Sequence, residues 1–174
     1  MRRIRSWSLA IVVTALLVLA TPMTGPASAH AIIELNGVSA VAGHSSVMTL
    51  EIQHGCLPAD PTVQVQAFVG KPWRSVSPTP VPGWISTVTA QPIGGWHITW
   101  VNTGAPVPFG TPIYFPMTVS WPAAAGVYAM TVLQVCPGSS NLWNTPNAPA
   151  TANSPSPPMT PRAEVRVLAQ VPRT

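Results

Sequence analysis

Apolar and polar residues alternate with a period of two along much of this chain. Between residues 45 and 54, Met48, Leu50 and Ile52 alternate with mostly polar neighbours, and residues 62–69 repeat the pattern. Because successive side chains of a strand point to opposite faces, this alternation predicts strands with one buried and one solvated face. Similar patterns predict six further strands at residues 31–35, 85–90, 96–101, 113–121, 127–136 and 163–169.

Proline and glycine interrupt these strands. Residues 78–84 contain three prolines, which lack the N–H of a strand ladder, so this segment is predicted to be a rigid crossing between two sheets. Residues 145–161 are rich in Pro, Ser, Ala and Asn and are predicted to form an extended, mobile connection. About eight short strands without helical periodicity predict an all-β chain, a single β-sandwich over residues 30–169 with a short tail at 170–174.

The first 29 residues have a different pattern. Three arginines among the first five residues precede an apolar run of twelve residues, and the segment ends in Ala-Ser-Ala. This order is typical of a secretory signal peptide, and the run is shorter than the ~20 residues that a membrane-spanning helix needs. We therefore expect cleavage after Ala29, which makes His30 the first residue of a secreted, periplasmic or cell-surface protein. A cut after Ala31 and an uncleaved anchor are the alternatives.

The balance of charge excludes a basic surface for nucleic acid. The sequence has eight basic and four acidic residues, but three of the basic ones belong to the predicted signal peptide. The processed chain therefore carries five basic and four acidic residues, too even a balance for recognition of a phosphate backbone. Its 145 residues suit one domain with its own core, and we expect a monomer.

Cys56 and Cys136 are the only cysteines of the chain. In an exported protein such a pair predicts a disulfide, which closes a loop of about 80 residues and is worth ~4–5 kcal/mol in the chain-entropy account. A metal site built on the two cysteines is the alternative, although an oxidising compartment disfavours it. His54 lies next to this pair in the sequence and is interpreted as a structural residue.

A histidine at the start of the processed chain is a candidate metal ligand. If the chain begins at His30, its free amine and its Nδ1 can close a chelate ring on a single ion. Cu(II) favours nitrogen ligands of this kind. An internal His30 has no free amine, so the metal site depends on cleavage after Ala29.

Several short motifs follow one another over most of the processed chain. They are Ala-Ser-Ala-His at 27–30, Ala42-Gly43, His54-Gly55-Cys56, Thr62, Pro78-x-Pro-x-Pro82-Gly83-Trp84, Phe115-Pro116, and Gln134-x-Cys136-x-Gly138 followed by Trp143. With these motifs the chain resembles the YcnI-like domain family of exported copper-binding proteins, in its cysteine-containing branch. The resemblance implies an immunoglobulin-like or cupredoxin-like sandwich. It also implies one Cu(II) ion bound by the amine and imidazole of His30, beside a carboxylate and a tryptophan.

The resemblance is incomplete at the metal ligands. Trp143 matches the tryptophan if one residue is gapped after Gln134, and it is expected near the metal as a shield from water. The family's glutamate follows Ala-Gly by three residues, where this chain has Ser46. His44 or Glu34 is the candidate replacement ligand. The function implied is copper handling, or copper delivery to membrane transport proteins.

Two other classes of function stay open. Trp73 and Trp84 are candidates for an exposed platform, which would suit an extracellular sandwich that binds protein or glycan without metal. A small copper oxidase would need a second imidazole, for which His44 and His54 are available. No Gly-x-Ser-x-Gly motif is present, and the acidic residues are few and scattered, so no other enzyme is expected.

Overall fold

A computed structural model describes residues 30–151, 156 and 158–171 of the chain. The predicted signal peptide and residues 172–174 of the predicted tail lie outside the described residues. The described part forms ten strands and no helix. The strands are β1 (Ala31–Glu34), β2 (Ser45–Ile52), β3 (Gln64–Val69), β4 (Ser75–Pro78), β5 (Trp84–Ala90), β6 (Trp96–Asn102), β7 (Ile113–Ser120), β8 (Gly126–Val135), β9 (Ser140–Trp143) and β10 (Ala163–Val167).

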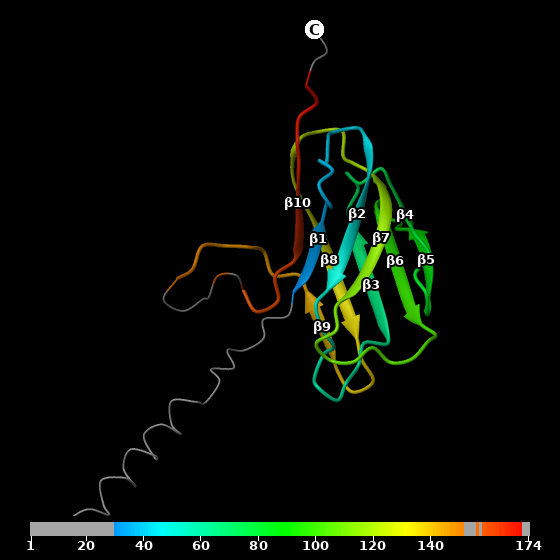
Figure 1. The fold of residues 1–174 in the computed structure, drawn as a ribbon. Helices are drawn as coiled ribbons and strands as arrows, with labels where there is room; N and C mark the ends of the chain where they lie inside the picture. The colour runs from blue at the N-terminus through cyan, green and yellow to red at the C-terminus, as the bar shows by residue number, and fades with distance from the viewer. Residues whose placement is uncertain (1–29, 152–155, 157, 172–174) are drawn as a thin grey trace, which may run out of the picture.

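The strands form two antiparallel sheets packed face to face (Figure 1). One sheet has four strands in the order β1-β2-β7-β4, and the other has six, in the order β10-β8-β3-β6-β5 with β9 paired to β8. The predicted all-β sandwich is therefore confirmed. No helix in the described ranges has the length and apolarity needed to cross a membrane.

The predicted crossing between the sheets is also confirmed. It leads from β4 at the edge of one sheet to β5 at the edge of the other, and Pro78 ends β4 where a missing ladder N–H is tolerated. The prediction missed β4 and β9. Each has only four residues, which is too short for a two-residue period to be recognised.

The inner faces of the two sheets form one core. Trp100 of β6 and Phe115 of β7 are buried and stack across the sandwich with ring centroids 4.7 Å apart. Trp84 makes a T-shaped contact with the same phenylalanine, and Trp73, which packs on Trp121, is only 3% exposed. The expectation of an exposed platform of Trp73 and Trp84 is therefore wrong, because Trp73 is in the core and Trp84 is half-buried.

The predicted disulfide is confirmed. Cys56 and Cys136 are bonded, with Cα atoms 6.2 Å apart, and they join the loop after β2 to the end of β8. This bond links the two sheets at one end of the sandwich.

The proline-rich connection leaves and rejoins the sandwich at one place. The Thr145 N–H donates to the carbonyl of Thr160, and the Arg162 N–H donates to the carbonyl of Thr145. The described parts of residues 145–161 extend away from the sheets between these two points (Figure 1). The last strand, β10, then starts at Ala163, beside the start of β1.

Candidate metal centre at the start of strand β1

His30 immediately precedes the first strand. Its carbonyl accepts a hydrogen bond from the Gln53 N–H at 3.3 Å, which extends the β1–β2 pairing by one step beyond Ala31 and Ile52. The backbone of His30 is thus fixed at the end of β2, and its side chain is half-buried.

His30 lines a pocket of about 360 Å³ between two edge strands, β1 and β10. Ala31, Ile32 and Ile33 of β1 form one side, and the other side is formed by Asn147, Pro161, Arg162, Ala163 and Glu164. The pocket therefore brings together the first residue of the predicted processed chain and a carboxylate from its last strand. Sequence reasoning did not select Glu164 as a site residue.

The Glu164 carboxylate is held in its ionised form. Burial alone would raise its pKa, but hydrogen bonds from Arg162 and Asn147, together with the charge of Arg162, lower the pKa below the usual value. The Arg162 Nε donates to Glu164 Oε1 at 2.7 Å. A carboxylate offers about four lone-pair positions, so these bonds leave capacity for a further partner.

The donors at this pocket fit Cu(II). After cleavage at Ala29, His30 would offer an amine and an imidazole nitrogen, and Glu164 would offer an ionised oxygen. Nitrogen and oxygen ligands in a tetragonal arrangement are those that Cu(II) prefers. Glu164 would thus take the place of His44 and Glu34, the two replacement ligands suggested by the sequence.

Glu34 has a different partner. It lies four residues after His30 on β1, roughly 13 Å of extended chain, and its side chain hydrogen-bonds with that of Glu51. Burial, the charge of Glu34 and this hydrogen bond all raise the pKa of Glu51. The two side chains lie together on the outer face of the four-stranded sheet.

His44 lies at the opposite end of β2 from His30. Nine residues separate it from Gln53, the residue opposite His30, which corresponds to roughly 30 Å of strand. His44 instead lines a second pocket with residues 168–171 near the chain's C-terminal end. The structure does not bring the two histidines together, so one ion cannot contact both.

Ser46 is also distant from His30, at the start of β2. Its hydroxyl accepts a hydrogen bond at 2.7 Å from the indole of Trp121, which is fully buried. Ser46, which occupies the position of the glutamate in the resembled family, therefore binds a core tryptophan in this chain.

Trp143 lies in the core rather than on the surface. It is 2% exposed on β9, opposite Val132, and its indole N–H has no hydrogen-bond partner among the described residues. It stands two residues before Thr145, where the chain leaves for the connection that helps to line the pocket. Indole offers only a donor N–H, so Trp143 can shield an ion but cannot bind it as a ligand.

His54 is held among other side chains and backbone. Its Nδ1 lies 2.5 Å from the carbonyl oxygen of Gly55, and its ring packs on Phe109 with centroids 4.7 Å apart. Its Nε2 is buried without a partner in the part of the chain that the structure describes. These contacts agree with its interpretation as a structural residue.

Comparisons with known proteins identify the fold. No family model matches the chain, and no curated protein matches it. An uncharacterised Nocardia farcinica protein, described as having an immunoglobulin-like fold, is 21% identical with a TM-score of 0.67, over 79% of this chain and 97% of that one. A cohesin module from a Clostridium perfringens family 33 glycoside hydrolase is 10% identical with a TM-score of 0.54, over 82% and 96%. At these identities the likeness concerns the fold alone, and the chain is an immunoglobulin-like β-sandwich.

Proposed function

We propose that this protein is an exported copper-binding protein. His30 would bind one Cu(II) ion through its amine and imidazole after signal-peptide cleavage, and Glu164 would provide a carboxylate ligand. The observation that carries the proposal is the shared pocket of His30 and Glu164. The resemblance to YcnI-like domains supports the choice of metal, and copper handling or delivery to membrane transport proteins is the role we infer from it.

The protein's own groups would make binding depend on pH. The Glu164 carboxylate keeps its charge well into the acidic range because Arg162 and Asn147 lower its pKa. The α-amine has a reference pKa of ~7.7–8.0, and copper competes with a proton for its lone pair. The affinity for copper should therefore fall as the pH drops through this range. Protonation of the amine, and not of Glu164, should cause the first decrease.

Electron paramagnetic resonance of Cu(II) tests the proposal. The chain starting at His30 should give a nitrogen-rich signal at one equivalent of copper. Both His30→Ala and a variant with one extra residue before His30 should abolish this signal, because each removes half of the chelate. Glu164→Gln should keep the two nitrogens but weaken binding by about tenfold, which corresponds to ~1.4 kcal/mol.

The control is His44→Ala. This histidine is roughly 30 Å along the strand from the site, so its loss should leave copper binding unchanged. Unaltered binding by the extended variant would contradict a role for the amine. Equal affinities of Glu164→Gln and the parent would remove the carboxylate from the ligand set.

The metal-free alternative, an extracellular module for protein or glycan, has less support. Its motivation was an aromatic platform, and Trp73 is buried. The copper-oxidase alternative needs a second imidazole near His30. His44 lines the other pocket, and His54 packs on Phe109 with its Nδ1 beside the Gly55 carbonyl. The alternative binding module would be favoured if the chain starting at His30 bound no copper.

A further inference from the structure

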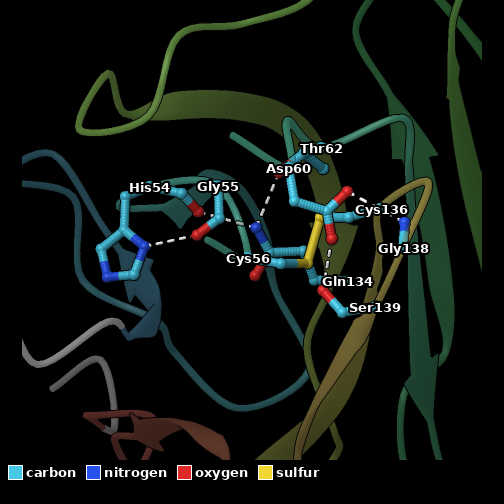
Figure 2. The surroundings of a disulfide bond; sticks show 9 residues. All are labelled: His54, Gly55, Cys56, Asp60, Thr62, Gln134, Cys136, Gly138 and Ser139. Carbon is cyan, nitrogen blue, oxygen red and sulfur yellow. Dashed lines mark hydrogen bonds between the residues drawn. A yellow bond between two sulfur atoms is a disulfide. The ribbon is translucent and has the colours of Figure 1, made fainter. Parts of the chain in front are cut away.

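The two disulfide-bonded cysteines are each held by a backbone turn. The Cys56 N–H donates to the carbonyl of Asp60 at 3.2 Å, and the Cys136 N–H donates to the carbonyl of Ser139 at 2.9 Å. Asp60 joins these turns, as Figure 2 shows, because its carboxylate accepts hydrogen bonds from the Gly138 N–H at 3.0 Å and the Ser139 hydroxyl at 2.5 Å. These bonds position both cysteines without the sulfur–sulfur bond.

The Asp60 side chain is nearly buried and has no cationic partner among the described residues. It is 9% exposed, and the ion pair found in the described part of the chain, between Arg162 and Glu164, does not involve it. A buried carboxylate is normally compensated by hydrogen bonds, by a cation or by a metal ion. Two hydrogen bonds compensate Asp60 in part, so the site can still accept a positive charge.

The ligand atoms of this group lie close together. One carboxylate oxygen of Asp60 and the sulfur atoms of Cys56 and Cys136 are all within 4.8 Å of one another. Tetrahedral Zn²⁺ sites use cysteine sulfur at ~2.3 Å and carboxylate oxygen at ~2.0–2.2 Å, with water in an open position. Small movements of the sulfur atoms after reduction would satisfy these distances.

We propose that the disulfide is one state of a redox-gated Zn²⁺ site. A dithiol reductant transfers two electrons and two protons to the Cys56–Cys136 bond and becomes a disulfide itself. The two thiols then release their protons as one Zn²⁺ binds to both sulfur atoms and to the carboxylate of Asp60. In the oxidised protein the sulfur atoms are bonded to each other, so the site does not form.

The donor chemistry favours Zn²⁺ over other ions. Two thiolates and a carboxylate together carry three negative charges, which a divalent cation would compensate in part. Cu(I) would use the soft thiolates alone, whereas Zn²⁺ accepts sulfur and oxygen together. Binding should release about two protons per ion and weaken as the pH falls.

The test compares the oxidised and reduced chain. The protein is reduced without denaturant by a phosphine, freed of reductant under anaerobic conditions, and titrated with Zn²⁺ against a chelator, while near-ultraviolet circular dichroism confirms folding. We expect one tight site in the reduced chain and none in the oxidised chain. Cd²⁺ in place of Zn²⁺ should give thiolate-to-metal charge-transfer absorption.

Three variants separate a site from nonspecific thiol binding. The double variant Cys56→Ser, Cys136→Ser should lose the tight site. Asp60→Asn should weaken Zn²⁺ binding by at least ~10-fold, the least expected even for an outer-shell partner. Ser139→Ala is the control, because it removes one hydrogen bond to Asp60 but no ligand, and its affinity should stay within a few-fold of the parent.

Two results would overturn the proposal. One is a reduced chain that unfolds or binds Zn²⁺ no more tightly than the double serine variant. The other is an Asp60→Asn variant that binds as tightly as the parent, which would leave Asp60 as a structural link between two turns. His30→Ala should not affect any of these measurements, so failure at one metal site is distinguishable from failure at the other.

Discussion

Two regions of this sandwich, the disulfide and the pocket of His30, are built differently. Around the disulfide, residues of the β2–β3 loop and of the β8–β9 loop are joined by a covalent bond and by short hydrogen bonds. At the β1 edge, the pocket of His30 and Glu164 depends on two edge strands from different sheets and on one ion pair. The first region is ordered by its own contacts. The second would offer all the proposed copper ligands only if the chain begins at His30, because the free amine is one of them.

This difference explains what several of the sequence motifs do. Gln134 is fully buried, and its side-chain amide donates to the carbonyl of His54 and to the hydroxyl of Thr62, both at 2.7 Å. A Cβ at Gly55 would lie 3.1 Å from the Asp60 carbonyl oxygen, so glycine allows the close approach of the loop. These motif residues converge on the disulfide and hold this part of the fold together (Figure 2).

Removal of the disulfide should have the largest effect on stability. The bond closes a loop with a sequence separation of 80 residues, and the chain-entropy account assigns ~4–5 kcal/mol to it. The double serine variant should therefore lose up to this amount in free energy of unfolding by denaturant titration. A loss below ~1 kcal/mol would mean that the hydrogen bonds around Asp60 suffice and that the contrast between the two regions is overstated.

Loss of the buried amide should be the next largest effect. Gln134→Met keeps the volume but leaves the His54 carbonyl and the Thr62 hydroxyl without their donor, which should cost ~1–3 kcal/mol. The control is Gln64→Met on the half-buried outer face of β3, where the change should stay within ~0.5 kcal/mol. Equal effects of the two substitutions would show that Gln134 has no special part in holding the region around the disulfide.

The sequence predicted the strands better than the site. The period of two identified the long strands, and two cysteines in a chain predicted to be exported were enough to predict their bond. His44 was proposed as a ligand because it precedes a strand, but the antiparallel pairing of β1 and β2 places His30 opposite Gln53 instead. The turn at Asn36-Gly37, where both residues have positive φ, did not reveal this register, because Glu34 pairs with Thr49 and not with a residue just after the turn.

Glu164 could not be found from the sequence. Its alternation with Ala163 and Val165 correctly placed it on the outer face of a strand. Its closeness to His30 depends on how the edges of the two sheets meet, which no local pattern encodes. The interior position of Trp143 was hidden for a related reason, since β9 is short and pairs only with β8.

The smallest predicted effect concerns the acidic pair near the β1 edge. Burial and the neighbouring Glu34 raise the pKa of Glu51 above its usual value of 4.5, so the folded state binds a proton more readily than the unfolded state. The favourable contribution of the protonated form is present below pH 4.5 and is lost as the pH rises through the raised pKa. Glu51→Gln should therefore raise the free energy of unfolding at neutral pH by ~0.2–1 kcal/mol, the usual range for a cross-strand pair, and bring no gain in the acidic range. Thermal unfolding of the variant and the parent at both pH values measures this, with Thr118→Val on the outer face of β7 as a control that should show no such pH dependence. A gain of equal size at both pH values would mean that Glu51 acts through packing and not through its raised pKa.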